Sequence, residues 1–202
     1  IKNKFGEHNH TVLLEQILIG QEVSLMGFCN GKTIKFLQQA QDYKRLNDNN
    51  KGPNTGGMGA ICPVNILNET ILNETILNDL REKCNKLVKD FGYIGILYLG
   101  LLIQDGRPYV LEFNCRFGDP EAQILLKNIK NDFGKLINDC INGNEFKLDL
   151  DDKIVMNVVC AHKKYTFSKL NEKDYVIIFI NNKSEGISLY FADPFKDEYL
   201  LK

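Results

Sequence analysis

Two strand patterns separated by a tight-turn signal place the strongest constraint on the fold. Residues 94–103, IGILYLGLLI, are almost continuously apolar and predict a buried strand. The turn QDGRP follows, and its Asp105-Gly106 pair is a strong hairpin signal. Residues 109–114, YVLEFN, predict the returning strand. We therefore expect an antiparallel hairpin, with the apolar residues of both strands buried.

The returning strand also carries polar residues at its end. Glu112 and Asn114 are two positions apart, so they share one face of the strand. A carboxylate and an amide oxygen suit Mg²⁺ when phosphates supply further ligands. Arg116 could hold a phosphate or a carboxylate through its planar guanidinium. A solvated face with a surface ion pair explains the same spacing equally well.

A long polar segment precedes this hairpin. Residues 42–60, DYKRLNDNNKGPNTGGMGA, predict a loop whose glycines let the backbone approach an anion closely. The segment lacks the Lys-Ser/Thr ending of a P-loop and does not match the dinucleotide pattern, so a flexible connector is the alternative. The residues of interest in this loop are Asp42, Lys44, Arg45, Gly56, Gly57, Met58 and Gly59.

The remaining elements are predicted from periodicity and turn signals. Strands are expected at 12–19, 22–29 and 33–41, with the last two joined by a turn at Asn30-Gly31. Helices are expected over 66–90 and from Pro120 to about Ile141, because proline suits the first helical turn. Glu15 and Glu22 flank the Gly turn after the first strand. Acids so placed can accept hydrogen bonds from ribose hydroxyls, although exposed acids beside a turn explain them as well.

The character of the chain changes after residue 146. Short β-like runs follow at 154–160, 175–181 and 186–191, without a catalytic pattern. We predict two domains, 1–146 and 147–202. The second would be small and β-rich, whether complete or incomplete.

Composition excludes several classes of protein. Twenty-five basic and 26 acidic residues give a net charge of −1, which does not favour nucleic acids or anionic membranes as partners. No apolar run approaches the roughly 20 residues of a membrane span. The six cysteines form no C-x-x-C pair, which predicts reduced thiols in a cytoplasmic protein. Cys115 has no neighbouring histidine, so we expect a buried thiol rather than a nucleophile.

Four stretches together carry a family resemblance. They are LLEQILIGQE, QAQDYKRLNDNNKGPNTGGMGA, GILYLGLLI and LEFNCRFGDPEAQ. In this order and spacing they resemble the phosphoribosylamine–glycine ligase family, ATP-grasp enzymes of purine biosynthesis, from about Phe5 to Asp139. The resemblance implies an α+β fold. The chain would be the C-terminal part of an ATP-grasp domain, an antiparallel sheet with packed helices, followed by a small β-rich domain.

The resemblance also implies a reaction and a set of roles. ATP would phosphorylate glycine, and 5-phosphoribosylamine would displace the phosphate to give glycinamide ribonucleotide. The implied metal ligands for Mg²⁺ or Mn²⁺ are Glu112 and Asn114, and the implied catalytic residues are Arg116 and Asp119. Glu15, the backbone near Ile17 and Glu22 would hold ATP through its adenosine. The seven loop residues named above would bind the amine and carboxylate substrates.

Several departures from the family pattern keep alternatives open. Tyr43 stands where the family usually has histidine, and 94–103 carries no second acid for the metal. The N-terminal domains of the family have no counterpart here, and the chain opens IKNKFGEHNH without methionine. We therefore expect a part of a longer ligase that is inactive when isolated. Another ATP-grasp carboxylate–amine ligase and a degenerate nucleotide-binding module are the alternatives. Oligomeric state, metal preference and fusion to other purine-pathway domains stay open.

Overall fold

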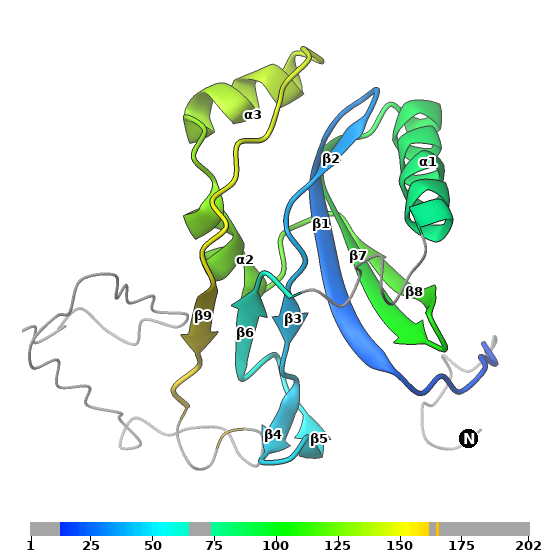
Figure 1. Cartoon of the computed structure of the whole chain (residues 1–202), viewed down its shortest axis with the longest axis vertical. Helices are drawn as coiled ribbons and strands as arrows, with labels where there is room; N and C mark the ends of the chain where they lie inside the picture. Colours follow the sequence, from blue (N-terminus) through cyan, green and yellow to red (C-terminus); the bar gives the residue numbers. More distant parts are fainter. Residues whose placement is uncertain (1–12, 65–73, 162–164, 166–202) are drawn as a thin grey trace, which may run out of the picture.

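The main sheet of the protein has four antiparallel strands. The computed structural model describes residues 13–64, 74–161 and 165. Within them the strand order is β2–β1–β7–β8 (Figure 1). The strands are β1 (Gln21–Asn30), β2 (Ile34–Phe36), β7 (Ile94–Gln104) and β8 (Arg107–Asn114). With three α-helices among the described residues beside the sheets, the α+β class is confirmed.

The predicted central hairpin is confirmed as β7–β8. Gln104 pairs with Arg107, and the two residues between them, Asp105 and Gly106, both have positive φ, 51° and 69°. That backbone matches the twist of the flanking strands, which explains the Asp-Gly pair. The register shifts at Leu111, because Gly100 pairs with Glu112 whereas Leu101 pairs with Val110. β8 therefore contains a bulge immediately before its polar end.

The expected burial of the apolar residues in β8 is wrong. Val110, Leu111 and Phe113 are 42%, 44% and 51% exposed. The cause is position, since among the described strands β8 lies at the edge of the sheet and pairs only with β7. In contrast, β7 lies between two strands, and Leu99 and Leu101 are fully buried.

Helix α1 (Glu74–Phe91) covers one face of the main sheet (Figure 1). Val88 of α1 packs in a cluster with Leu25 and Cys29 of β1 and with Leu97 and Leu99 of β7. The predicted helix over 66–90 is confirmed from Glu74 onward, and residues 66–73 lie outside the described part. This face is a dry core between a helix and a sheet.

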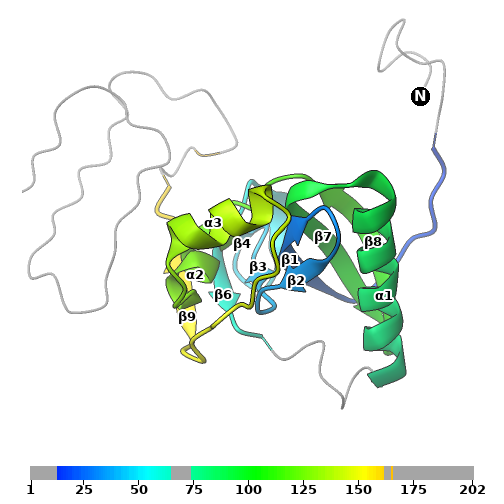
Figure 2. The same cartoon turned by 90° about the horizontal axis from the view of Figure 1, so that it is seen from above.

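The other face of the sheet is covered by smaller elements. Figure 2 shows α1 on one side of the main sheet and α2 and α3 on the other. A second cluster joins Met26 and Phe28 of β1 to Ile124, Leu125 and Leu136. The covering elements are α2 (Glu121–Leu125), the 3₁₀ turn η2 (Leu126–Asn128), α3 (Phe133–Ile141), and the three-stranded sheet β3 (Gln41–Asp42), β6 (Gly59–Cys62) and β9 (Val155–Val158), in the order β3–β6–β9.

The single helix predicted from Pro120 to Ile141 is wrong, because the chain leaves the helix between η2 and α3. Ile129 is extended and forms a β-bridge with Leu150. Asp132 then caps α3, accepting a hydrogen bond from the Lys135 backbone N–H at 2.9 Å. The aspartate at residue 132 was the available signal for a new helix start.

Two strand predictions before the loop also need correction. The strand expected at 12–19 is absent over residues 13–19, which pair with none of the described strands and are largely exposed. The strand expected at 33–41 ends at Phe36, and pairing resumes at Ala40, which forms a β-bridge with Ser24 immediately before β3.

The loop predicted at 42–60 also contains strand structure. A short hairpin of β4 (Arg45–Asn47) and β5 (Lys51–Asn54) lies inside it. Asn49 and Asn50 turn this hairpin, with φ of 58° and 56°. The polar composition had suggested a loop, whereas pairing between its two halves forms the strands.

The strand predicted at 154–160 is confirmed as β9, which pairs along its length with β6. The first strand after residue 146 is thus joined to the preceding part of the chain. The runs predicted at 175–181 and 186–191 lie outside the described residues, and the division into domains 1–146 and 147–202 stays a prediction. Among the described helices, none is long and apolar enough to cross a bilayer.

Candidate active site

A polar cavity of about 180 Å³ opens over the second face of the main sheet. Strand alternation builds it, because Ser24, Gly100 and Glu112 stand opposite one another across β1, β7 and β8. The polar side chains that line it come from both sheets and the loop: Glu22, Ser24, Asp42, Lys44, Asn54, Tyr98 and Glu112. Of the predicted site residues, Glu22, Asp42, Lys44 and Glu112 therefore line one cavity.

The predicted metal pair lies at the β8 edge of this cavity. Glu112 and Asn114 share one face, as expected, and the Asn114 Nδ2 donates to Glu112 Oε1 at 3.1 Å. Gly100 leaves room for the pair, since a Cβ there would lie 3.0 Å from Glu112 Cγ. A rotation of the Asn114 amide by about 180° would instead place its oxygen beside the Glu112 carboxylate. These oxygens suit Mg²⁺ or Mn²⁺ when phosphates supply the other ligands. The described residues contain no group of three or more His, Cys, Asp or Glu placed to hold a metal.

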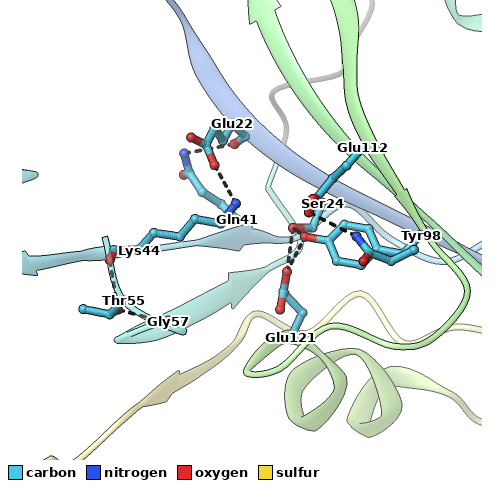
Figure 3. A network of polar contacts seen from close by, with 10 residues as sticks. Glu22, Ser24, Gln41, Lys44, Thr55, Gly57, Tyr98, Glu112 and Glu121 are labelled. Carbon is cyan, nitrogen blue, oxygen red and sulfur yellow. Dashed lines mark hydrogen bonds and ion pairs between the residues drawn. The ribbon is translucent and has the colours of Figure 1, made fainter. Parts of the chain in front are cut away.

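Lys44 supplies the positive charge of the cavity. Its Nζ lies 2.8 Å from the Oε2 of Glu22, and Figure 3 shows the two side chains reaching toward each other. Burial acts to lower the pKa of Lys44, but the hydrogen bond and charge of Glu22, with the charges of Asp42 and Glu112, raise it overall. The ammonium therefore stays charged and can meet a phosphate or a carboxylate.

Asp42 is the least satisfied acid in the cavity. Its Oδ1 is buried and has no hydrogen-bond partner among the described residues. Loss of hydration raises the pKa of Asp42 to about 7, and the negative charge of Glu121 adds to this. A carboxyl group with this pKa can exchange a proton near neutral pH.

The glycine-rich loop packs directly against Asp42. Gly57 has φ of 119°, and a Cβ there would lie 2.9 Å from Asp42 Oδ1 and 2.4 Å from Pro120 Cδ. The loop is fixed from both sides, because Met58 N–H donates to the Tyr43 carbonyl and Tyr43 N–H donates to the Gly59 carbonyl, each at 2.9 Å. A glycine is required at 57 both by its backbone conformation and by this close approach.

A buried hydroxyl–carboxylate network lies behind the cavity (Figure 3). Ser24 Oγ donates to Glu121 Oε1 at 2.7 Å, and Tyr98 OH donates to the same oxygen at 2.8 Å. Glu121 is only 2% exposed. Gly118 admits it, because a Cβ there would lie 2.5 Å from Glu121 Oε2. Burial, followed by the charge of Glu121, raises the pKa of Tyr98, which therefore remains a neutral donor.

Sequence reasoning missed Ser24, Tyr98 and Glu121. A signal was present for all three. Ser24 shares its strand face with Glu22, Tyr98 is the one residue with a polar side chain in 94–103, and Glu121 follows the proline in the GDPEAQ stretch. What was missing was the register between β1 and β7, which brings the Ser24 and Tyr98 hydroxyls to 2.9 Å.

The other predicted residues do not line this cavity. Arg45 donates to the Gly52 carbonyl at 2.9 Å, within the β4–β5 hairpin. Arg116 donates to the Phe117 carbonyl at 2.8 Å and is exposed, and Asp119 accepts from Gln123 Nε2 at 2.8 Å. Each of these three side chains is thus engaged locally.

The first predicted strand places its candidate residues on an open segment. Glu15 is exposed, and the Ile17 side chain is 86% exposed. The segment is tied to the hairpin by the Ile19 N–H, which donates to Gln104 Oε1 at 2.9 Å. Gly56 lies at the loop surface, with Tyr165 OH near its free face. Cys115 is exposed, so the expected burial of its thiol is wrong.

Comparisons with known proteins agree with the resemblance seen in the sequence. Residues 1–122 match the family described as phosphoribosylglycinamide synthetase, ATP-grasp (A) domain. A phosphoribosylamine–glycine ligase from Listeria monocytogenes serotype 4b is 40% identical over 98% of this chain and 47% of its own length. The trifunctional purine biosynthetic protein adenosine-3 of Drosophila melanogaster is 40% identical over 73% of this chain and 11% of its own length.

The structural comparison gives the same relationship. The crystal structure of a phosphoribosylamine–glycine ligase from Thermotoga maritima matches with a TM-score of 0.65 and 34% identity. That match covers 76% of this chain and 39% of the crystallised one. The chain spans about half the length of the single-function curated relatives it matches.

Proposed function

This chain belongs to the phosphoribosylglycinamide synthetase family and carries part of its ATP-grasp domain, and on that premise we propose that it supplies part of the active site of a ligase. The ligase joins glycine to 5-phosphoribosylamine. ATP phosphorylates the glycine carboxylate, and the amine then displaces phosphate from the acyl phosphate. The products are glycinamide ribonucleotide, ADP and phosphate, in the cytoplasm.

The observation that carries the proposal is the meeting of opposite charges in one cavity. Glu112, Asp42 and Lys44 come from β8, β3 and the chain just before β4, yet they line the same space of about 180 Å³. Phosphoryl transfer requires positioning and charge neutralisation more than covalent participation by the protein. A cavity with acids for a cation and a lysine for an anion meets that requirement.

Each predicted residue has a place in this scheme. Glu112 and Asn114 would hold Mg²⁺ or Mn²⁺, which supplies charge neutralisation to the phosphates when bound. Lys44 would face the carboxylate or phosphate, because its ammonium stays charged beside Glu22. Arg116 and Asp119 follow β8 immediately and would act on the transferred group once their side chains leave their local partners.

The nucleotide would occupy the open side of the hairpin. Glu15 and Ile17 lie on the segment that leads into β1, and Glu22 is the second residue of β1. The Ile19 N–H links this segment to Gln104 at the end of β7. Exposed apolar side chains on this segment and on β8, Ile17 and Leu111 among them, offer a surface for an adenine ring. Arg45, Gly56, Gly57, Met58 and Gly59 would complete the substrate loop around Asp42 and Lys44.

The test is glycine-dependent ADP formation with freshly generated 5-phosphoribosylamine, using the protein in its natural length. We expect Glu112→Ala to lower the rate by about 100-fold or more, since one preorganised electrostatic contact to the reacting group is commonly worth that much. Glu82→Ala, on the exposed surface of α1, is the matched control and should leave the rate unchanged.

The same assay separates the alternatives. Equal rates for Glu112→Ala and the control would remove Glu112 from the site. ADP formation that follows another carboxylate instead of glycine would indicate a different ligase of the same fold. ATP binding without ADP formation from any carboxylate and amine would indicate a nucleotide-binding module.

A further inference from the structure

One chemical requirement of the ligation is not met by the residues assigned so far. When a neutral amine attacks an acyl phosphate, its nitrogen gains a fourth bond and must lose a proton before a stable amide remains. We propose that Asp42 accepts this proton, as the general base of the amide-forming step. The inference rests on the proposed function and adds to it a role for one carboxylate.

Geometry favours Asp42 over the other acids of the cavity. Glu22 is held by Lys44 at 2.8 Å, and Glu112 accepts from Asn114 at 3.1 Å. Glu121 is buried behind the cavity wall and accepts two hydroxyl hydrogen bonds on one oxygen. Asp42 lines the cavity, and among the described residues its side chain forms no ion pair and no hydrogen bond with another side chain; its Oδ1 is buried beside Gly57. It is thus the acid of this cavity that no side-chain partner holds.

The surroundings hold that oxygen in place. Asp42 lies in β3, which pairs with β6 through Ala60. Gly57 approaches Oδ1 so closely that a Cβ would stand 2.9 Å from it, and Pro120 closes the other side of the glycine. A base must lie within hydrogen-bond reach of the proton it takes, and a fixed strand position meets that requirement better than a mobile loop.

The neighbouring charges tune the group toward neutral pH. Loss of hydration raises the pKa of Asp42 most, and the charges of Glu121 on α2 and Glu22 on β1 raise it further. The charge of Lys44 and the nearby Tyr43 backbone N–H lower the pKa, leaving a value of about 7. Tyr98 on β7 faces the same space as a neutral hydroxyl, and Glu112 lies across the cavity. A general base is most effective when its pKa lies near the working pH.

The step balances without any further reactant. The nitrogen lone pair forms a bond to the acyl carbon, and the bond from that carbon to the phosphate oxygen breaks. Phosphate leaves with the electron pair, and one N–H proton moves to Asp42. The carboxyl group then returns this proton to water.

The experiment compares two stages of the reaction in the protein of natural length. In the absence of the amine, glycine-dependent scrambling of a labelled bridging oxygen in ATP measures acyl phosphate formation. Amide formation is measured in the presence of 5-phosphoribosylamine. We expect Asp42→Asn to lower amide formation by about 100-fold or more, the usual scale of general base catalysis, while scrambling stays within about threefold of wild type. Asp79→Asn, on the exposed surface of α1, is the matched control.

A second readout distinguishes a base from a residue that only maintains structure. In wild type, kcat/KM for the amine should rise with pH through about 7, and this rise should disappear in Asp42→Asn. Asp42→Glu keeps a carboxylate and should recover part of the rate. Thermal melting of both variants verifies that they are folded.

Each other result counts against the proposal. Amide formation within about threefold of wild type in Asp42→Asn shows that Asp42 takes no required proton. Scrambling that falls as far as amide formation shows that Asp42 acts earlier, as a binding residue. If wild type itself forms no ADP with glycine, the proposed ligase function fails, a result distinct from the first two.

Discussion

The two faces of the main sheet are built from alternate residues of the same strands, yet they differ in chemistry. On the α1 face, Leu25 of β1 stands opposite Leu99 of β7, both in a dry cluster with Val88. On the cavity face, Ser24 and Tyr98 bind a buried carboxylate instead. One step along each strand separates a hydrocarbon core from a polar site.

The difference shows how a single hairpin can serve stability and chemistry at once. Apolar burial on the α1 face stabilises the sheet by about 25 cal/mol for each Å² removed from water. On the cavity face, the lost hydration of Asp42 and its repulsion by Glu121 and Glu22 oppose folding when the Asp42 carboxyl group is ionised. We expect the stability gained on the α1 face to offset the stability lost on the cavity face, whose residues are arranged for ligands. The next three predictions test that division.

The largest effect should come from the dry face. Leu99→Ala removes a fully buried side chain from the centre of the α1 cluster. We expect the free energy of unfolding to fall by about 3–5 kcal/mol, because the cavity left behind adds to the lost burial. Urea denaturation measures it, with Leu126→Ala, at a 37% exposed site, as the comparison. A loss below about 1 kcal/mol would mean that this face does not carry the stability.

The network behind the cavity should give an intermediate effect. Glu121→Ala leaves the Ser24 and Tyr98 hydroxyls without their shared acceptor, so we expect a loss of about 2–3 kcal/mol. Glu121→Gln keeps an acceptor oxygen and should lose about 1 kcal/mol or less. The difference between the two variants in urea denaturation isolates the hydrogen bonds from the packing. Equal losses would contradict a role for the shared oxygen.

The smallest effect should come from Asp42, and it should have the opposite sign. The pKa of its carboxyl rises to about 7 on folding from an ordinary value near 4, so folding favours the protonated form. Below about pH 4, Asp42 is protonated in both states and does not lower the free energy of unfolding. Between about pH 4 and pH 7 the destabilisation grows, and above about pH 7 it is complete.

Asp42→Asn removes that cost. We expect the variant to be more stable than wild type at pH 8 by about 1–2 kcal/mol. This is less than the full pKa shift of Asp42 would give, because the residue is partly exposed to solvent. The two proteins should converge by about pH 4. Thermal melting across this range measures the difference, with Asp79→Asn as the control. A variant less stable than wild type at pH 8 would contradict the assignment of an unpaired, destabilised carboxylate.

Much of the fold could be read from local patterns. The hairpin at Asp105-Gly106, the strand at 22–29 and the helix ending near residue 90 each follow from a few adjacent residues, because turn geometry and periodicity are local. The face shared by Glu112 and Asn114 follows from strand alternation in the same way. Membership in the family could also be inferred, because its motifs keep their order and spacing.

The errors fall where distant parts of the chain decide the outcome. The burial of Phe113 depends on its strand lying at an edge, and the exposure of residues 13–19 depends on their finding no partner strand. The β4–β5 hairpin formed within a segment whose composition suggested a loop. Strand pairing is a relation between two segments, so the sequence of one segment cannot specify it.

The sequence by itself determined which residues could carry charge, which faces of the strands they occupy and where the chain turns. Only the tertiary structure decided that Ser24, Tyr98 and Glu121 meet, and that Asp42 is left with an unpartnered oxygen among the described residues. The reason is physical. Alternation and turn propensity act over a few residues. Hydration loss and hydrogen bonding instead depend on neighbours that are distant in the sequence, such as Ser24 and Glu121, which are 97 positions apart.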